Sequence, residues 1–122
     1  MVKTLKKIAA LAGAVVLSAT MLSGCAKEKE ADTLVFGTNA EFPPFEFVSS
    51  NGLIDQYDGI DIAVAKKIGD DNGMAVKIEN MEFDSLLIAL QNGQIDAVIA
   101  GMTVTEERKE AVDFSTPYYV AK

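Results

Sequence analysis

The chain has 122 residues, with 18 acidic and 11 basic side chains, one cysteine and no histidine. This length is enough for one domain at most. The absence of histidine excludes His-based catalytic triads and most catalytic zinc sites, and the single Cys25 excludes an intrachain disulfide. The formal net charge of −7 argues against nucleic acid as a partner, because nucleic acid selects basic surfaces.

The first 24 residues have the pattern of a bacterial targeting signal. Three lysines precede an apolar run, residues 8–22, which is shorter than the roughly 20 residues that span a bilayer. The sequence LSGC at 22–25 resembles the lipobox of bacterial lipoproteins, which implies cleavage before Cys25 and a lipid on its thiol. An ordinary secretory leader is the alternative. We therefore predict a lipoprotein signal peptide over residues 1–24 and a polar, lipid-anchored tether over 25–32, for which a frayed helix is the alternative.

Strand and helix patterns alternate along the rest of the chain. β-Branched and apolar runs predict strands at 33–37, 75–80 and 95–100. Helices are expected from Asp61 to the 70–73 run, over 86–91, and from Thr105 through Ala111, with Asp61, Thr105 and either Asp84 or Ser85 as N-caps. Residues 38–44 should be irregular because of Pro43 and Pro44, whereas 45–48, 112–114 and 118–121 should be extended. This alternation predicts an α/β fold with a parallel sheet.

Three loops follow the predicted strands, over Thr38–Pro44, Met81–Asp84 and Gly101–Thr105. The carboxyl ends of parallel strands lie at one edge of a sheet, and ligands of such sheets bind beyond that edge. We therefore expect the three loops to share a ligand site.

Arg108 is the only arginine and lies in the first turn of the helix that Thr105 opens. A surface ion pair with Glu106 or Glu107 is one interpretation, and such pairs contribute little. The other is that the guanidinium and the free N–H groups of the helix start converge on an anion. A guanidinium can bind a carboxylate through two parallel hydrogen bonds, which lysine cannot do.

Aromatic and acidic side chains in the same loops have two interpretations each. Phe42 and Phe83 could form walls of a small pocket or close the rim of the core. Glu41 and Glu46 could suggest an acid/base pair, but their spacing fixes no geometry and no nucleophile accompanies them. The acidic run at 70–73 lacks the ligand spacing of a calcium loop, so capping of the preceding helix is the better account.

Four ordered blocks of sequence resemble a known family. They are GTNAEFPPFE at 37–46, GIDI at 59–62, FDSLLIAL at 83–90, and DAVIAGMTVTEER at 96–108 followed by VDFSTPYY at 112–119. Together they resemble the first lobe of an extracytoplasmic solute-binding protein, in the family 3 subgroup that serves ABC importers for polar amino acids. The resemblance implies a periplasmic-binding-protein-like first lobe over residues 33–122, with three layers and a mostly parallel sheet flanked by helices.

The resemblance also implies a place for the backbone groups of an amino-acid ligand. Arg108 would hold the α-carboxylate, with help from the hydroxyl and backbone N–H of Thr103. The backbone at Ala100 and Gly101 would meet the α-ammonium through a carbonyl oxygen.

The ligand's side chain would meet three further residues. Phe42 would lie against its aliphatic part and Phe83 would form part of the wall. Asn39 stands where many relatives carry an acid, and its neutral amide argues against lysine or arginine as the ligand.

Members of this family are longer, with a second lobe and a return segment, so the chain is expected to be a fragment that stops before lobe 2. Without that lobe, amino-acid binding should be weak. The expected partners are an amino acid, an ABC permease and, through the lipid on Cys25, the outer face of the cell membrane or its periplasmic side. We expect a monomer that needs no cofactor or metal and is not an enzyme. A sensor input domain and a dehydratase-like enzyme of the same architecture are the alternatives.

Overall fold

The computed structural model describes residues 32–122. The predicted signal peptide, Cys25 with its lipid, and the tether up to residue 31 lie outside the described residues. Within residues 32–122, no helix is both long and apolar enough to cross a membrane.

The centre of the fold is a parallel sheet of three strands. They are β1 (Thr33–Thr38), β5 (Ala75–Asn80) and β6 (Ala97–Val98), in the order β5-β1-β6. Along β1 and β5 the pairing runs from Thr33 opposite Ala75 to Thr38 opposite Asn80. The predicted α/β class with a parallel sheet is confirmed.

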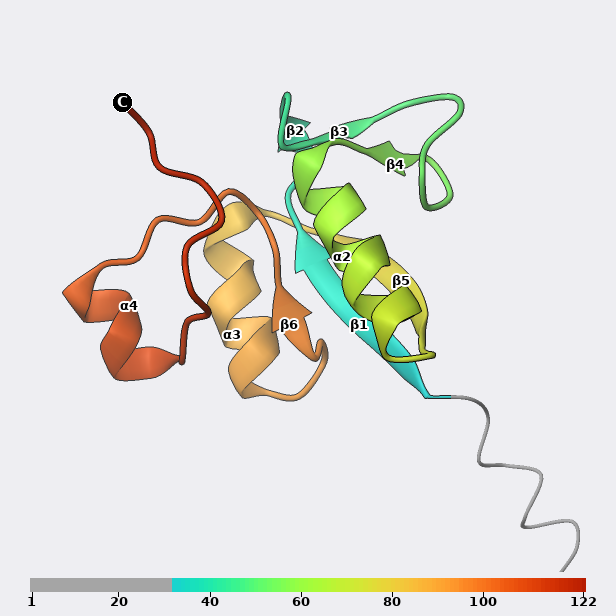
Figure 1. The fold of residues 1–122 in the computed structure, drawn as a ribbon. Helices are drawn as coiled ribbons and strands as arrows, with labels where there is room; N and C mark the ends of the chain where they lie inside the picture. The colour runs from blue at the N-terminus through green and yellow to red at the C-terminus, as the bar shows by residue number, and fades with distance from the viewer. Residues whose placement is uncertain (1–31) are drawn as a thin grey trace, which may run out of the picture. The chain divides into compact units, whose positions relative to one another are not determined.

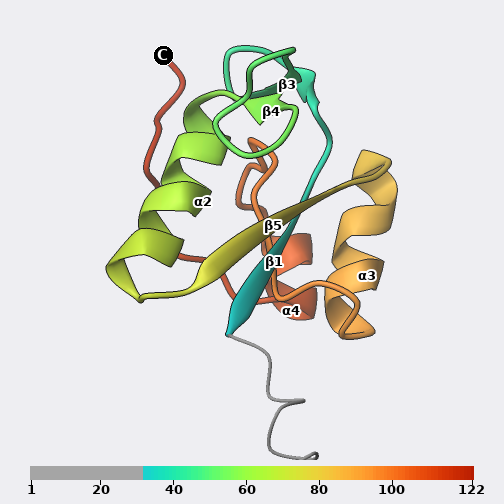
Figure 2. The same cartoon turned by 90° about the vertical axis from the view of Figure 1, so that its right-hand side faces the viewer.

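Helices cover both faces of this sheet. Helix α2 (Ile60–Asp71) lies on one side and α3 (Leu86–Gln91) on the other, which gives three layers (Figures 1 and 2). The short α4 (Glu106–Ala111) follows beyond α3. The core under α2 consists of buried side chains from the helix and all three strand regions: Phe36, Ile62, Ala65, Ile78 and Ile99.

A small antiparallel sheet lies at the carboxyl end of β1 (Figure 1). It consists of β2 (Glu41–Phe42), β3 (Glu46–Val48) and β4 (Tyr57–Asp58). The prediction that 38–44 is irregular was therefore wrong at β2. The two prolines occupy the turn that the Phe45 N–H closes on the Phe42 carbonyl, 2.9 Å away, so the residues on either side remain free to pair.

The strand predicted over 95–100 is also shorter than expected. Ile95 is buried but precedes β6. The Asp96 N–H still donates to the Val35 carbonyl at 2.8 Å, but the Val35 N–H donates to the Asp96 carboxylate at 2.9 Å and not to a backbone carbonyl. Only Ala97 and Val98 pair with β1. The segments 112–114 and 118–121 are not among the strands of the described residues.

The helix ends confirm the predicted C-terminal caps and part of the N-terminal ones; Ser85 stands at the N-cap of α3 but its side chain makes no capping hydrogen bond. Helices α2 and α3 both end at an Asn-Gly pair, and Gly73 takes the left-handed φ of +64° that suits a helix C-terminus. Thr105 caps α4 as predicted. The assignment of Asp61 as an N-cap was wrong, because α2 begins at Ile60 after Gly59 and the Asp61 carboxylate binds partners outside its own helix.

Candidate functional site

The three loops predicted to share a site meet at the carboxyl edge of the sheet. The Met81 N–H donates to the Thr38 carbonyl at 2.9 Å, and the Asn39 amide donates to the Met81 carbonyl at 3.1 Å. The Ala40 N–H donates to the side chain of Asn80 at 2.8 Å. These bonds join the loop after β1 to the loop after β5, as the topology predicted.

Arg108 is half-buried and is held by the two neighbouring loops. Its Nη1 donates to the Thr103 carbonyl at 2.7 Å. Its guanidinium carbon lies 5.4 Å from the ring centroid of Phe83, at the start of the 3₁₀ turn η2 (Phe83–Ser85), which is within cation–π range. Glu106 pairs instead with Lys109. Among residues 32–122 Arg108 therefore has no carboxylate partner, and the predicted surface ion pair is not formed.

The start of α4 offers fewer free N–H groups than the sequence suggested. The Thr105 hydroxyl oxygen accepts the Arg108 backbone N–H at 3.1 Å, so this amide is not free to bind an anion. The guanidinium keeps unused N–H donors in a planar fork, which is the geometry that a carboxylate needs.

Phe42 and Gly101 form a second group at this edge. Phe42 is 52% exposed and stacks on Phe45, with ring centroids 5.3 Å apart. Gly101 has a φ of +55°, which favours glycine, and a Cβ added there would lie 3.1 Å from the Phe42 ring. The preceding Ala100 is buried. The exposed Phe42 ring therefore lies directly over the Gly101 backbone.

Asn39 and Thr103 hold the loops. The Asn39 amide is bonded to Met81, and the Thr103 carbonyl is bonded to Arg108. The Thr103 side chain is exposed. The predicted residues thus fall into an Arg108–Thr103–Phe83 group and a Phe42–Gly101 group, with Asn39 between the loops after β1 and β5.

A buried acidic pair, which our sequence analysis did not predict, lies beneath Gly101. Glu46 on β3 is 1% exposed and Asp61 on α2 is 0% exposed. Asp61 Oδ2 accepts the Gly101 N–H at 2.6 Å, and its Oδ1 accepts the Tyr118 hydroxyl at 2.7 Å. Burial, together with the nearby Asp61 carboxyl, raises the pKa of Glu46 from its ordinary 4.5 to about 8. Burial and the bond to Asp61 also raise the pKa of Tyr118.

The acid/base pair considered for Glu41 and Glu46 is not formed. Glu41 is exposed whereas Glu46 is buried, and the carboxyl near Glu46 belongs to Asp61. One signal for this was available, since Asp61 precedes Ala65 by four residues and so lies on the buried face of its helix. An acid at such a position requires polar partners.

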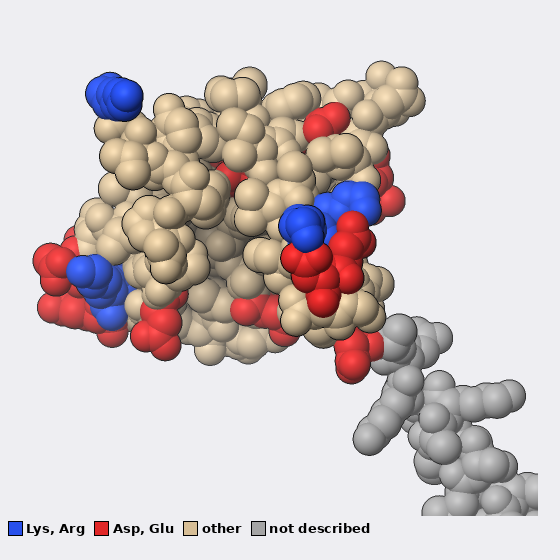
Figure 3. All heavy atoms as spheres, in the orientation of Figure 1, with Lys and Arg blue, Asp and Glu red and all other residues tan. Residues whose placement is uncertain are grey.

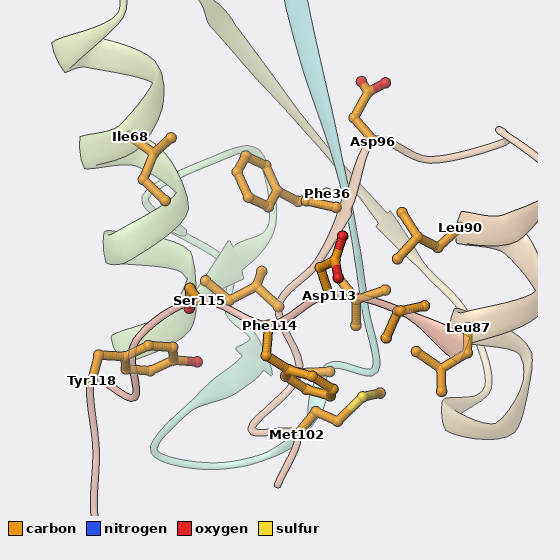
Figure 4. A pocket seen from close by; sticks show the side chains of 15 residues that line it. Phe36, Ile68, Leu87, Leu90, Asp96, Met102, Asp113, Phe114, Ser115 and Tyr118 are labelled. Atoms are coloured by element: carbon orange, nitrogen blue, oxygen red, sulfur yellow. The ribbon is translucent and has the colours of Figure 1, made fainter. Parts of the chain in front are cut away.

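Two hollows open near these groups. One of about 280 Å³ is bordered by the Arg108 group, with lining residues Phe83, Asp84, Leu87, Met102, Glu107, Arg108 and Ala111. The other, of about 300 Å³, lies between the sheet, α3 and the segment 112–118 (Figure 4). Its labelled lining is mostly apolar, with Leu87 and Leu90 from α3 facing Ile68 and Tyr118 across it. Because Arg108 borders only the first hollow, that one is the better candidate for an anionic group.

Charged side chains are few among the residues that line the two hollows: Asp96 and Asp113 in the larger one, and Asp84, Glu107 and Arg108 in the smaller one. In Figure 3 charged side chains gather over α2 and α4, and the surface between is largely uncharged and hollowed. Those over α2 pair with each other, Lys66 with Asp70 and Lys67 with Asp71. Among residues 32–122, no three His, Cys, Asp or Glu side chains gather in a way that could hold a metal ion.

Several solved structures resemble this fold. The chain is 47% identical to domain 1 of TmArgBP in its arginine-bound form, with a TM-score of 0.67 over 71% of this chain and 67% of that one. It is 53% identical to an ancestral arginine-binding protein bound to arginine, with a TM-score of 0.66 over 71% of this chain and 37% of that one.

Relatives in living bacteria are similar over a comparable stretch. The arginine-binding extracellular protein ArtP of Bacillus subtilis is 37% identical over 86% of this chain and 40% of its own length. A probable histidine-binding protein of Neisseria gonorrhoeae is 34% identical over 89% of this chain and 43% of its own. The chain thus spans about 40% of the length of these relatives, which are named as binding proteins and not as enzymes.

The model of one protein family, the bacterial extracellular solute-binding proteins of family 3, matches residues 34–122. That match covers most of the chain and every described helix and strand except the first residue of β1. The resemblance carried by the four sequence blocks is therefore confirmed, and this chain belongs to the bacterial extracellular solute-binding proteins, family 3.

Proposed function

We propose that residues 33–122 form the first lobe of an extracytoplasmic protein that captures a polar amino acid for an ABC importer. The observation that carries this proposal is the state of Arg108. Its guanidinium is fixed by the Thr103 carbonyl at 2.7 Å and the Phe83 ring, and no carboxylate of residues 32–122 neutralises it. A carboxylate supplied by a ligand would complete it.

Arginine is the first ligand to test. Several relatives are named as arginine-binding, and others as histidine- or cystine-binding. The neutral amide of Asn39 had argued against a cationic ligand. Because that amide is bonded to Met81, its lack of charge says less about the ligand than the sequence suggested.

A first lobe could hold its ligand without a second one. Domain 1 of TmArgBP is described in an arginine-bound form, which argues against our expectation that amino-acid binding is weak without the second lobe. In this chain Arg108 and Phe42 are partly open to water, so ion pairing should be weaker than in a closed site.

The expected partners and location follow from the same role. The amino acid would pass to an ABC permease, and a lipid on Cys25 would hold the monomeric protein at the cell membrane, with no cofactor. Cys25→Ser should move the protein from the membrane fraction to the soluble fraction. Retention at the membrane would show that the lipid is not the anchor.

Calorimetry with L-arginine, L-histidine, L-cystine and L-glutamine tests capture by the wild-type chain. Binding of at least one, lost when the α-carboxylate is converted to an amide, supports the proposal. No binding of any polar amino acid would contradict it. Mass analysis of the ligand after incubation separates a binding protein, which returns it unchanged, from a dehydratase-like enzyme.

A further inference from the structure

The C-terminal segment, residues 113–122, crosses the body of the fold as a strap with few attachments. It contains none of the described helices or strands. The Tyr118 hydroxyl donates to Asp61 Oδ1 at 2.7 Å, which is the one hydrogen bond that joins the strap to the rest of residues 32–122. The Tyr119 ring adds an edge contact with Phe45, with ring centroids 5.0 Å apart. The strap is therefore held mainly at one carboxylate.

The strap also closes one side of the larger hollow, which measures about 300 Å³. Phe114, Ser115 and Tyr118 line this hollow from the strap, and Leu87 of α3 lies across from Tyr118 (Figure 4). Movement of the strap away from Asp61 would open this mostly apolar hollow to water.

The carboxylate that holds the strap is one member of the buried acidic pair. Asp61 is 0% exposed and Glu46 is 1% exposed, and the two carboxyl groups lie within hydrogen-bonding reach of each other. Asp61 already accepts from Gly101 and Tyr118, so a proton held by the pair belongs on Glu46. Two adjacent carboxylates repel each other when both are charged and cut off from water. The pair therefore suits this geometry only while it holds one proton.

Nothing else among the described residues offsets a second charge at this place. No ion pair of residues 32–122 includes Glu46 or Asp61. On the strands beside β3, Glu41 and Asp58 stand opposite the residue that follows Glu46, and so they lie on the other face of the small sheet. The titratable groups that face Glu46 are thus Asp61 from α2 and Tyr118 from the strap.

We propose that the Glu46–Asp61 pair is a pH-sensitive latch, which holds the strap closed while the pair keeps its one proton and releases Tyr118 when that proton is lost to water. The strap is the part that moves, because one hydrogen bond and one ring contact stabilise it less than the burial of a second charge costs. Tyr118 is 49% exposed, so its departure lets water reach both carboxylates. The latch works without any ligand and is independent of the proposed function.

The direction of the switch follows from the buried carboxyl. In the closed arrangement, burial first and the Asp61 carboxyl second raise the pKa of Glu46 from 4.5 to about 8. Once water reaches Glu46, its pKa returns toward the ordinary value, because burial was the larger cause. The strap should therefore be closed below about pH 4.5 and open above about pH 8.

Tyrosine fluorescence measures the latch directly. A phenol hydroxyl bonded to a carboxylate has quenched emission, and the chain contains three tyrosines and no tryptophan. Between pH 4.5 and 8 the emission of the full chain should rise, by up to about 1.5-fold when one of the three tyrosines loses its carboxylate acceptor. Tyr118→Phe should abolish this rise, whereas Tyr119→Phe leaves the latch in place and should keep it.

The acid is tested by a matched pair of variants. Glu46→Gln carries no titrating proton, so its strap should stay closed and its emission should stay flat over the same range. Glu41→Gln, at an exposed acid on the neighbouring strand, should keep the full rise. A flat wild type, or a rise in Glu46→Gln equal to that of the wild type, would overturn the proposal. So would a loss of helical circular dichroism together with the rise, because the whole fold and not the strap would then be opening.

A measurement on the wild type covers the case in which Glu46→Gln does not fold. In the full chain labelled with ¹³C at the glutamate carboxyl carbons and the tyrosine rings, NMR follows both ends of the latch during one pH titration. The Glu46 carboxyl signal and the Tyr118 ring signals should change with the same midpoint. Separate midpoints would overturn the proposal.

Discussion

The candidate site has two ends that carry opposite charges in opposite settings. At one end Arg108 is half-buried on a six-residue helix and is held by one carbonyl and one ring. At the other end Asp61 is fully buried, and both its oxygens are bonded. The difference indicates that the cation is placed to meet something from outside, whereas the anion is built into the fold.

The largest effect should come from removing the exposed charge. Arg108→Ala deletes the proposed carboxylate partner and should weaken amino-acid binding by at least about 100-fold. The free energy of unfolding should change by less than about 1 kcal/mol, because the Arg108 side chain packs near the surface and outside the core. Calorimetry and urea unfolding measure the two quantities.

Lys109→Ala is the control, since it removes the neighbouring cation, whose ion pair with Glu106 at 3.0 Å is exposed. It should leave binding unchanged. If Arg108→Ala binds amino acids as tightly as the wild type does, the ligand's carboxylate binds elsewhere. The contrast between Arg108 and Asp61 would then no longer hold.

The free energy of unfolding should depend on pH because of the buried Glu46 carboxyl, which lies near Asp61. Burial and the nearby Asp61 carboxyl raise the pKa of Glu46 from 4.5 to about 8, so the folded chain holds this proton more tightly than the unfolded chain does. The resulting stability is fully present below about pH 4.5, falls as the pH rises, and is lost above about pH 8. The loss should be on the order of a few kcal/mol.

Urea unfolding at a series of pH values between those limits measures this loss. Glu46→Gln keeps the shape but carries no titrating proton, so the difference between the two curves isolates Glu46 from the other groups. Parallel curves for variant and wild type would show that Glu46 does not hold the proton.

Asp61→Ala should lower the free energy of unfolding through the loss of a buried acceptor. It leaves the Gly101 N–H without its acceptor, which costs on the order of 2 kcal/mol of unfolding free energy. Tyr118 is 49% exposed, so its hydroxyl can turn to water when Asp61 is removed, and the loss of its bond should contribute less. Asp58→Ala likewise removes the acceptor of a glycine N–H, that of Gly59 at 2.7 Å, and should lower stability less, because Asp58 is only half-buried. Equal losses would mean that burial at Asp61 has no special weight.

Asp61 also marks where sequence reasoning failed. Asp61 precedes the helical pattern, and acids commonly cap helices, so the local sequence favoured a cap. Its partners, Gly101 and Tyr118, are 40 and 57 residues away in the chain, and no local pattern encodes such long-range bonds. The buried acid on the apolar face was the only signal.

Other features were predictable because they depend on local chemistry. The Asn-Gly helix ends, the Thr105 cap and the two longer strands follow from backbone preferences and side-chain periodicity. The meeting of the three loops follows from topology alone. The length of β6 did not, because the Asp96 carboxylate and not a backbone carbonyl accepts the Val35 N–H, and a run of apolar residues cannot show that.

The smallest expected effect concerns a single hydroxyl at the exposed end. Thr103→Ala keeps the backbone carbonyl that holds Arg108 at 2.7 Å and removes only the hydroxyl proposed to assist at the ligand carboxylate. One such hydrogen bond contributes about 1 kcal/mol, so the amino-acid affinity measured by calorimetry should fall about fivefold, well short of Arg108→Ala. Thr103→Ser retains a hydroxyl and should restore it. Because the carbonyl that holds the guanidinium is retained, a loss as large as that of Arg108→Ala would mean that the hydroxyl contributes far more than one hydrogen bond, and the assisting role proposed for it would be wrong.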